Sequence, residues 1–452
     1  MTTRPTPPSQ PTDKEQHMQI NALLDVNVVA LESDDEVTVL LDLEAPAARA
    51  EDTRPPASLQ VVLDRSGSMA GAPLEGAKKA LISLVRRLDP TDNFGLVTFD
   101  DSARVVVPAG PLTDKDAVVR LIQGVEPGGM TDLSAGYLRG LREVRRVLGE
   151  GSATVLVVSD GHVNSGIRDV GDFESITAKA AGERIVTSTL GYGRRYDETL
   201  LSAIARSGSG NHVFAEDPDA AAAAISEEVD GLLSKVVQAL SMTITVEPAV
   251  ELLRLYNDLP ATPVAERQVM VEVGDLYAAE TRKVLLKLKV PARAALGLAR
   301  IATLELAYVE LPGLVEHVAT LPISVNVVPG DEAANRVPHP TVRSEALFQE
   351  AQAAKREASE AYERGDHEQG QRLMAETYDR LRASLSIAPD LLKPGIRSEM
   401  EEVTRMQEYG TLNGMAGAAA MSKMTRASYH RGSRKRGRAP RPGRDESGEN
   451  QP

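Results

Sequence analysis

The chain of 452 residues contains no cysteine and no tryptophan, and aromatic residues make up only 3% of it. Without cysteine it has no disulfides, no thiolate zinc ligands and no cysteine nucleophile. The seven histidines are scattered, and no HExxH motif or other histidine pair at ligand spacing occurs. No apolar run approaches the ~18 residues of a membrane helix, and the first 17 residues lack the apolar core of a secretory signal. We therefore expect a multidomain cytoplasmic protein without a membrane segment, whose cores are built from Val, Leu, Ile and Ala.

The charge is unevenly distributed. The net charge is −14, yet residues 426–444 carry seven Arg and one Lys with no acidic residue, so the remainder carries −22. An acidic body repels polyanions, so we expect no nucleic-acid binding beyond nonspecific attraction through this basic tail. A solvated tail, or one that contacts the acidic body, is the alternative.

The hydrophobic periodicity changes along the chain and predicts several domains. Short apolar strands alternate with helical stretches over 57–235, which predicts a doubly wound, mostly parallel sheet. Period-two segments at 24–30 and 37–43, and five more within 240–328, predict antiparallel strands. An isolated hairpin is marginal, so we expect residues 18–45 to pair with 240–328 in one β-sandwich that flanks the α/β unit.

Three further segments complete the predicted organisation. Helical spacing over 343–410 predicts an α-helical hairpin followed by a third helix. Residues 1–17 are rich in Pro and Thr, and residues 411–452 are rich in Gly, Ser and Arg, so we predict that both ends are disordered.

Polar residues gather on three loops of the α/β unit. The sequence DRSGS (64–68) follows the strand predicted at 59–63, GGMTD (128–132) lies between two predicted helices, and SDG (159–161) ends the strand predicted at 154–158. Ligands of open α/β sheets bind at the carboxyl ends of the strands. These loops offer carboxylate and hydroxyl oxygens, which suit Mg²⁺, Mn²⁺ or Ca²⁺ and disfavour zinc. Asp and Ser after a strand also cap helices, so the prediction depends on the motifs occurring together.

The three motifs, in this order, resemble the von Willebrand factor A (VWA) domain and its metal-ion-dependent adhesion site. The resemblance implies five metal-site residues: Asp64, Ser66, Ser68, Thr131 and Asp160. It covers about 57–235, and the strand-rich flanks are similar to those of bacterial and inter-alpha-inhibitor-type VWA proteins. In this family a carboxylate of the partner completes the coordination of the ion.

The resemblance implies a non-enzymatic, metal-dependent adaptor that binds an acidic side chain of a protein partner. Family analogy suggests an AAA+ ATPase as one such partner. Met130 and His162 flank the predicted site and are candidate partner contacts, although a loop histidine without a role is the alternative for His162. Two other functions remain open: a metal-dependent hydrolase using Asp64 and Asp160, and an adaptor acting mainly through the C-terminal helices.

Overall fold

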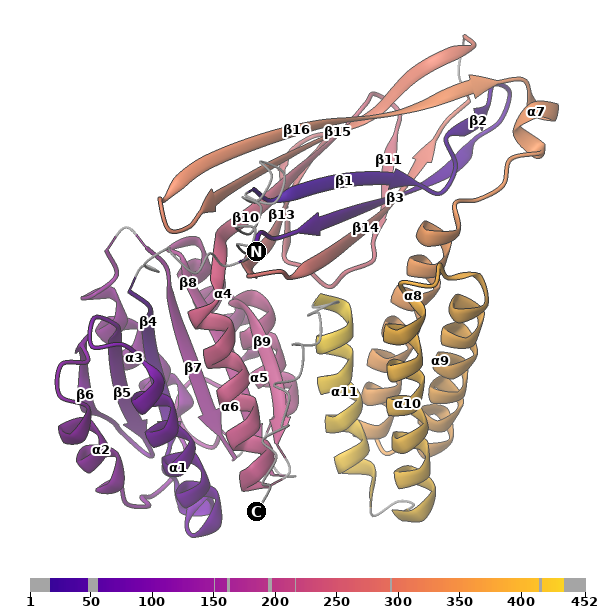
Figure 1. Ribbon diagram of the computed structural model, residues 1–452. Helices are drawn as coiled ribbons and strands as arrows, with labels where there is room; N and C mark the ends of the chain where they lie inside the picture. The colour runs from indigo at the N-terminus through magenta and orange to yellow at the C-terminus, as the bar shows by residue number, and fades with distance from the viewer. Residues whose placement is uncertain are drawn as a thin grey trace, which may run out of the picture.

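The computed structural model describes residues 17–47, 56–149, 151–160, 163–193, 197–215, 217–292, 295–413 and 417–434. Figure 1 shows three parts: an α/β unit, a β-sandwich above it and a bundle of helices beside it. The expected fold class is the one that the structure has, an α/β unit inserted in a sandwich and followed by helices. The predictions of disorder for 1–16 and for 435–452 lie outside the described residues.

The α/β unit is built on a six-stranded sheet in the order β6-β5-β4-β7-β8-β9. All neighbouring strands are parallel except β6, which is antiparallel to β5 at the edge. The strands are β4 (Ser58–Asp64), β5 (Asn93–Phe99), β6 (Ala103–Pro111), β7 (Ala153–Ser159), β8 (Ile185–Tyr192) and β9 (Ser209–Ala215).

Helices cover both faces of this sheet because successive strand residues point to opposite faces. Val61 and Leu63 of β4 pack in one core with α1, α2 and α6, whereas Val62 packs in a second core with α3, α4 and α5. The helices are α1 (Ala72–Arg87), α2 (Lys115–Gln123), α3 (Leu133–Arg145), α4 (Val170–Gly182), α5 (Glu198–Ser207) and α6 (Pro218–Leu233), with a short 3-10 turn η2 (Gly67–Met69) before α1.

Two sheets form the sandwich around a single core of Val, Leu, Ile and Met side chains. One has the order β1-β3-β14-β11 and the other β12-β13-β10-β15-β16-β2, so N-terminal strands lie in both sheets. The strands are β1 (Gln19–Leu24), β2 (Val28–Ala30), β3 (Asp35–Glu44), β10 (Lys235–Val246), β11 (Glu251–Leu255), β12 (Ala261–Ala265), β13 (Gln268–Tyr277), β14 (Thr281–Val290), β15 (Gly297–Glu310) and β16 (Val315–Val328).

The single strand expected at 24–30 is wrong, because the chain breaks at Asp25 and changes sheet. The Asp25 carboxylate accepts hydrogen bonds from the backbone N–H groups of Val26 and Thr38, both at 2.7 Å. These bonds compete with strand pairing and redirect the backbone. As a result β1 pairs with β3, whereas β2 pairs in parallel with β16 at the edge of the other sheet.

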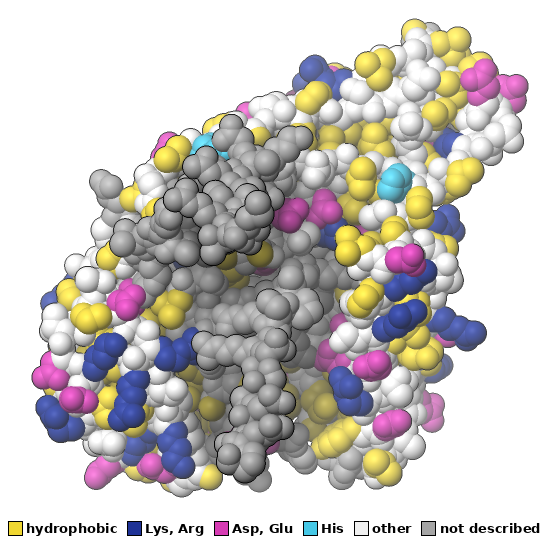
Figure 2. Space-filling model, viewed as in Figure 1, with side chains coloured by type: hydrophobic (Ala, Val, Ile, Leu, Met, Phe, Trp, Pro, Cys, Tyr) yellow, Lys and Arg dark blue, Asp and Glu magenta, His cyan; other side chains and the backbone are white. Residues whose placement is uncertain are grey.

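The C-terminal region is a helical bundle with its own apolar core. It contains α8 (Pro340–Glu363), α9 (His367–Ile387), α10 (Lys393–Asn413) and α11 (Ala418–Arg434), and the short helix α7 (Gly330–Ala334) precedes it. In the described part of the chain no helix is both long and apolar enough to cross a membrane. On the face shown in Figure 2, acidic and basic side chains are interspersed on the described surface.

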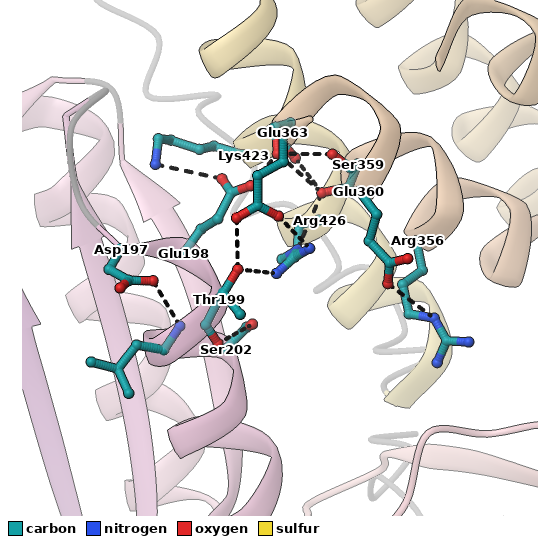
Figure 3. Close-up of polar contacts among 12 residues, drawn as sticks. Asp197, Glu198, Thr199, Ser202, Arg356, Ser359, Glu360, Glu363, Lys423 and Arg426 are labelled. Carbon is teal, nitrogen blue, oxygen red and sulfur yellow. Dashed lines mark hydrogen bonds and ion pairs between the residues drawn. The ribbon is translucent and has the colours of Figure 1, made fainter. Parts of the chain in front are cut away.

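The prediction of disorder from residue 411 onward is wrong for α11. This helix buries Met421, Ala427 and Tyr429, and it packs between α8 and the α/β unit, where it contacts β9. Two basic side chains of α11 form ion pairs with neighbouring helices (Figure 3). Lys423 pairs with Glu198 of α5 at 3.5 Å, and Arg426 pairs with Glu363 of α8 at 3.2 Å. The first part of the basic segment therefore contacts the acidic body of the same chain.

Candidate metal centre

The candidate site lies where two neighbouring parallel strands end at the same edge of the α/β sheet. β4 and β7 are paired in parallel, with Leu63 beside Val158, so their carboxyl ends lie side by side. From β4 the chain proceeds to β5 on one side, and β7 lies on the other side. Such a change of direction opens a crevice at the carboxyl ends of the strands, which is the usual ligand position in open α/β sheets.

A chain of hydrogen bonds joins four of the five predicted metal ligands. Asp64, which is fully buried, accepts from the Ser66 backbone N–H at 2.8 Å. The hydroxyls of Ser66 and Ser68 lie 3.1 Å apart, and the Ser68 hydroxyl donates to Oδ1 of Asp160 at 2.9 Å. Two strands more than 90 residues apart thus contribute oxygen atoms to one cluster.

Thr131, the fifth predicted ligand, is held beside this cluster by its backbone. Its N–H donates to Oδ1 of Asn164 at 2.9 Å, and its carbonyl accepts from the N–H groups of Asn164 and Ser165, both at 3.2 Å. The preceding loop is tied to the first motif, because the N–H of Gly67 donates to the carbonyl of Gly129 at 2.9 Å. Thr131 itself is buried, whereas the neighbouring Gly129 and Met130 are exposed.

The two predicted partner contacts both stay predictions, and the structure describes only one of the two residues. Met130 is 55% exposed and precedes Thr131 in the chain, so its large apolar side chain is accessible to a partner. His162 lies outside the described residues, and its role stays a prediction.

The electrostatics of the site favour a cation. Burial raises the pKa of Asp64, and burial together with the nearby Asp64 charge raises the pKa of Asp160 to about 6, although the Ser68 hydrogen bond opposes this. Within the described part of the chain, no Lys, Arg or His forms an ion pair with either carboxylate. Two buried carboxylates without a positive partner are costly unless a cation or a proton compensates them.

The oxygen spacing also fits a small divalent ion. Mg²⁺ binds oxygen at 2.0–2.1 Å in octahedral geometry, so neighbouring ligand oxygens are about 3.0 Å apart. The Ser66–Ser68 and Ser68–Asp160 oxygen distances of 3.1 and 2.9 Å match this spacing. The residues present therefore fit the group that the sequence motifs imply.

The sequence reasoning missed residues that support the cluster. The hydroxyl of Ser159 donates to Oδ2 of Asp64 at 2.6 Å and thereby orients that carboxylate. On the loop after β5, the buried Asp100 pairs with Arg65 at 2.5 Å. Burial opposes ionisation of Asp100, but hydrogen bonds from neighbouring backbone N–H groups and the Arg65 charge hold its pKa below the usual value. An Asp directly after the strand predicted at 94–99 was the available signal.

Gly128 is required where the Asp100 and Thr131 loops approach each other. A Cβ atom at this position would lie 2.0 Å from Oδ2 of Asp100, and the N–H of Gly128 donates to the Arg65 carbonyl at 2.6 Å. A side chain here would separate the first and second motif loops, so the first glycine of this motif has a steric reason.

Comparisons with known proteins agree with this geometry. The family model described as von Willebrand factor type A domain matches residues 59–228. An uncharacterized protein of Synechocystis sp. is 30% identical over 39% of this chain and 42% of its own length. Human inter-alpha-trypsin inhibitor heavy chain H3 is 28% identical over 36% of this chain and 20% of its own length. The chain thus spans less than half the length of these curated relatives.

Two solved structures share nearly the whole fold. A von Willebrand factor type A protein from Catenulispora acidiphila superposes with a TM-score of 0.72 at 16% identity, covering 95% of this chain and 99% of the other. The ArnB paralog VWA2 from Sulfolobus acidocaldarius gives 0.64 at 15% identity, with 92% and 99% covered. At these identities the likeness is one of fold, and it extends over the sandwich and the helices as well. The family-model match, with which the strand–loop geometry agrees, identifies residues 59–228 of this chain as a von Willebrand factor type A domain.

Proposed function

We propose that the chain binds one divalent cation, Mg²⁺ before Mn²⁺ or Ca²⁺, through Asp64, Ser66, Ser68, Thr131 and Asp160. The observation that carries this proposal is the hydrogen-bonded chain from Asp64 through Ser66 and Ser68 to Asp160, which contains two buried carboxylates without an ion pair to a described cationic side chain. All five side chains offer oxygen, the donor preferred by these hard ions.

We further propose that the bound ion captures a carboxylate of a protein partner, which makes the protein an adaptor. Three of the five side chains are neutral hydroxyls, and we propose that the two Asp carboxylates act through bound water. The ion then keeps most of its positive charge and attracts an outside anion. Ser68 is exposed, and exposed Met130 lies at the same edge, so a partner side chain has access and an apolar contact beside the ion.

The alternative is a metal-dependent hydrolase that uses the same centre. Hydrolysis requires a general base within hydrogen-bonding reach of an attacking water. Among the described residues, Ser159 adds a hydroxyl to the cluster, and the carboxylates of Asp64 and Asp160 are both assigned to the ion. The charge of Asp100 also acts on Asp64, but Asp100 is paired with Arg65. We therefore favour binding over catalysis, and an assay for phosphate-ester and peptide hydrolysis in the presence of Mg²⁺ distinguishes the two.

Calorimetric titration with Mg²⁺ and Mn²⁺ tests the metal proposal. We expect one ion per chain in the wild type and at least about 10–100-fold weaker binding in Asp64→Ala and in Ser68→Ala. Asp172→Asn and Ser175→Ala, on the exposed surface of α4, are matched controls that should bind as the wild type does. If Asp64→Ala keeps wild-type affinity, the assignment is wrong.

Partner capture is tested by pull-down followed by mass spectrometry. A partner that binds through the ion should be lost with EDTA, be restored by Mg²⁺ and be absent with Asp160→Ala. A partner that persists in both EDTA and Asp160→Ala would instead bind elsewhere, and variants of the surface of α8–α10 would then locate it.

A further inference from the structure

Three potential metal ligands from distant parts of the sequence converge on the sandwich. They are His17, Glu310 and His317, and one ligand atom of each lies within 4.8 Å of the others. Nδ1 of His17 is 3.1 Å from Oε2 of Glu310, and Nε2 of His317 is 3.2 Å from the same oxygen. Among the described residues this is the one group of three or more His, Asp and Glu side chains with such spacing.

The β15–β16 hairpin positions two of these ligands. In the antiparallel register, Tyr308 is opposite His317 and Glu310 is opposite Val315. Residues two apart on a strand share a face, so Glu310 lies on the face of Tyr308, diagonally across from His317. The Tyr308 ring stacks on the imidazole of His317, with 5.1 Å between centroids and 18° between planes, and this contact fixes the orientation of the ring.

The third ligand comes from the other sheet of the sandwich. His17 precedes β1, which belongs to the sheet of β3, β14 and β11, whereas Glu310 and His317 belong to β15 and β16 of the opposite sheet. The imidazole rings of His17 and His317 are 5.9 Å apart. The cluster therefore bridges the two sheets at the point where the first described residues meet the hairpin.

From these contacts we propose a transition-metal site, of zinc type, formed by His17, Glu310 and His317. Zinc binds nitrogen and oxygen ligands at about 2.0–2.1 Å in tetrahedral geometry, which places neighbouring ligand atoms about 3.3 Å apart. The two measured nitrogen–oxygen distances lie close to this value. Two imidazoles and one carboxylate form a donor set that binds Zn²⁺ more readily than Mg²⁺, in contrast to the all-oxygen centre of the VWA domain.

The exposure of the ligands leaves room for the ion to enter and for a fourth ligand. The His17 side chain is 56% exposed, that of His317 32% and that of Glu310 13%. Three protein ligands with one open position can accept water or a donor from another molecule. Because the ligands meet only in the folded sandwich, the ion would bind the native state selectively and hold the two sheets together.

Zinc titration of the full-length protein in excess Mg²⁺ tests the proposal, with calorimetry as the readout. On the proposed function, excess Mg²⁺ occupies the oxygen centre, so zinc uptake reports on the new site. We expect one zinc ion per chain, and affinity reduced at least about 10–100-fold in His17→Ala and in His317→Ala. His17 is exposed, so its substitution leaves the fold intact even if His317→Ala disturbs the hairpin.

Two further variants separate this site from the rest of the protein. His367→Ala, in the helical bundle, is the histidine control, and Asp64→Ala removes the proposed VWA centre; both should bind zinc as the wild type does. Zinc should also raise the melting temperature of the wild type but not that of His17→Ala. The proposal is overturned if the wild type takes up no zinc, if His17→Ala binds it equally well, or if uptake is lost only with Asp64→Ala.

Discussion

Lys355 shows at the residue scale how polar groups stabilise the C-terminal bundle. Its side chain on α8 is fully buried, pairs with Glu399 of α10 and donates to the Ser428 hydroxyl of α11 at 2.7 Å. One ammonium group thus joins three helices. A buried charge of this kind is tolerated only while its partners remain in place.

We expect Lys355→Ala to lower the free energy of unfolding by about 3–5 kcal/mol, because it leaves the Glu399 carboxylate without its cation inside the bundle. Urea unfolding of the full chain followed by circular dichroism measures this loss. Lys393→Ala is the control, since Lys393 pairs with Asp390, which is 95% exposed, and a surface pair contributes about 0–1 kcal/mol. Equal losses for the two substitutions would contradict the stabilising role of the buried Lys355–Glu399 pair.

His212 predicts a pH dependence of stability. It lies buried on β9 with a 2.8 Å hydrogen bond to the Thr189 hydroxyl, and burial, with the nearby Arg426 and Lys423 charges, lowers its pKa to about 3. The folded protein therefore keeps this imidazole neutral, whereas the unfolded chain takes up a proton below about pH 6.5. Proton uptake by the unfolded chain therefore lowers the free energy of unfolding as the pH falls from 6.5 toward 3, whereas above pH 6.5 this loss is absent.

At pH 5 this linkage amounts to about 2 kcal/mol. Chemical unfolding at several pH values should show a shallower loss of stability between pH 6.5 and 5 in His212→Gln than in the wild type. His367→Gln should leave the wild-type slope unchanged. A wild-type slope in His212→Gln would show that this imidazole is protonated in the folded state.

At the scale of elements, α11 is the connection between the bundle and the VWA domain. Arg426 reaches Thr199 of α5 at 3.1 Å, Ser359 of α8 at 3.1 Å and Glu363 of α8 at 3.2 Å (Figure 3). Glu198 accepts a hydrogen bond from Ser422 and pairs with Lys423 of the same helix. Burial raises the pKa of Glu198, and these contacts oppose that shift.

We expect Arg426→Ala to weaken this docking by about 2 kcal/mol, because hydrogen bonds to a charged group are lost in a mostly buried position. The rate of backbone amide hydrogen exchange should then rise in α11 and in α5, while the rate in β4 and β7 stays unchanged. Arg397→Ala, on the exposed side of α10, serves as the control. Unchanged exchange in α11 would mean that apolar packing alone holds the helix.

On the scale of the whole molecule, the sandwich depends on the chain segments that precede and follow the α/β unit. β3 lies between β1 and β14, so without residues 18–45 only β14 and β11 remain of that sheet. Val284, Leu286 and Leu288 of β14, fully buried in the complete chain, would then face solvent along an open strand edge.

We therefore expect a fragment of residues 57–235 to fold and melt cooperatively, since it contains a complete sheet with helices on both faces. A fragment of 235–328 should aggregate, and adding residues 17–47 as a separate peptide should restore a soluble, folded sandwich. Calorimetry and light scattering measure both outcomes. Cooperative melting of 235–328 alone would contradict the shared sandwich.

The sequence by itself determined the type of the α/β unit and its candidate metal residues. The strand–helix alternation is local, and the motifs DRSGS, GGMTD and SDG contain all five oxygen-donating residues. Short stretches of sequence were therefore enough to predict the fold type of this unit and its candidate metal residues. The sequence missed β6 and β9 at the edges of the sheet. Both are partly exposed, the apolar run of β6 contains Pro108, and β9 has only the short apolar stretch at 213–215. It also missed α11, because the helical apolar positions at 421–429 are embedded in a Gly- and Arg-rich segment.

The tertiary structure alone decided which distant residues meet. Asp64 and Asp160 become neighbours only through the pairing of β4 with β7, and the charge of Asp100, which directly follows β5, also acts on Asp64. His17 and His317 are 300 positions apart, and no local spacing marks them as ligands, yet sandwich closure brings them to one carboxylate. Local sequence encodes periodicity and turn chemistry, whereas long-range contacts follow from burying apolar faces together, so the structure was needed to reveal the second candidate metal site.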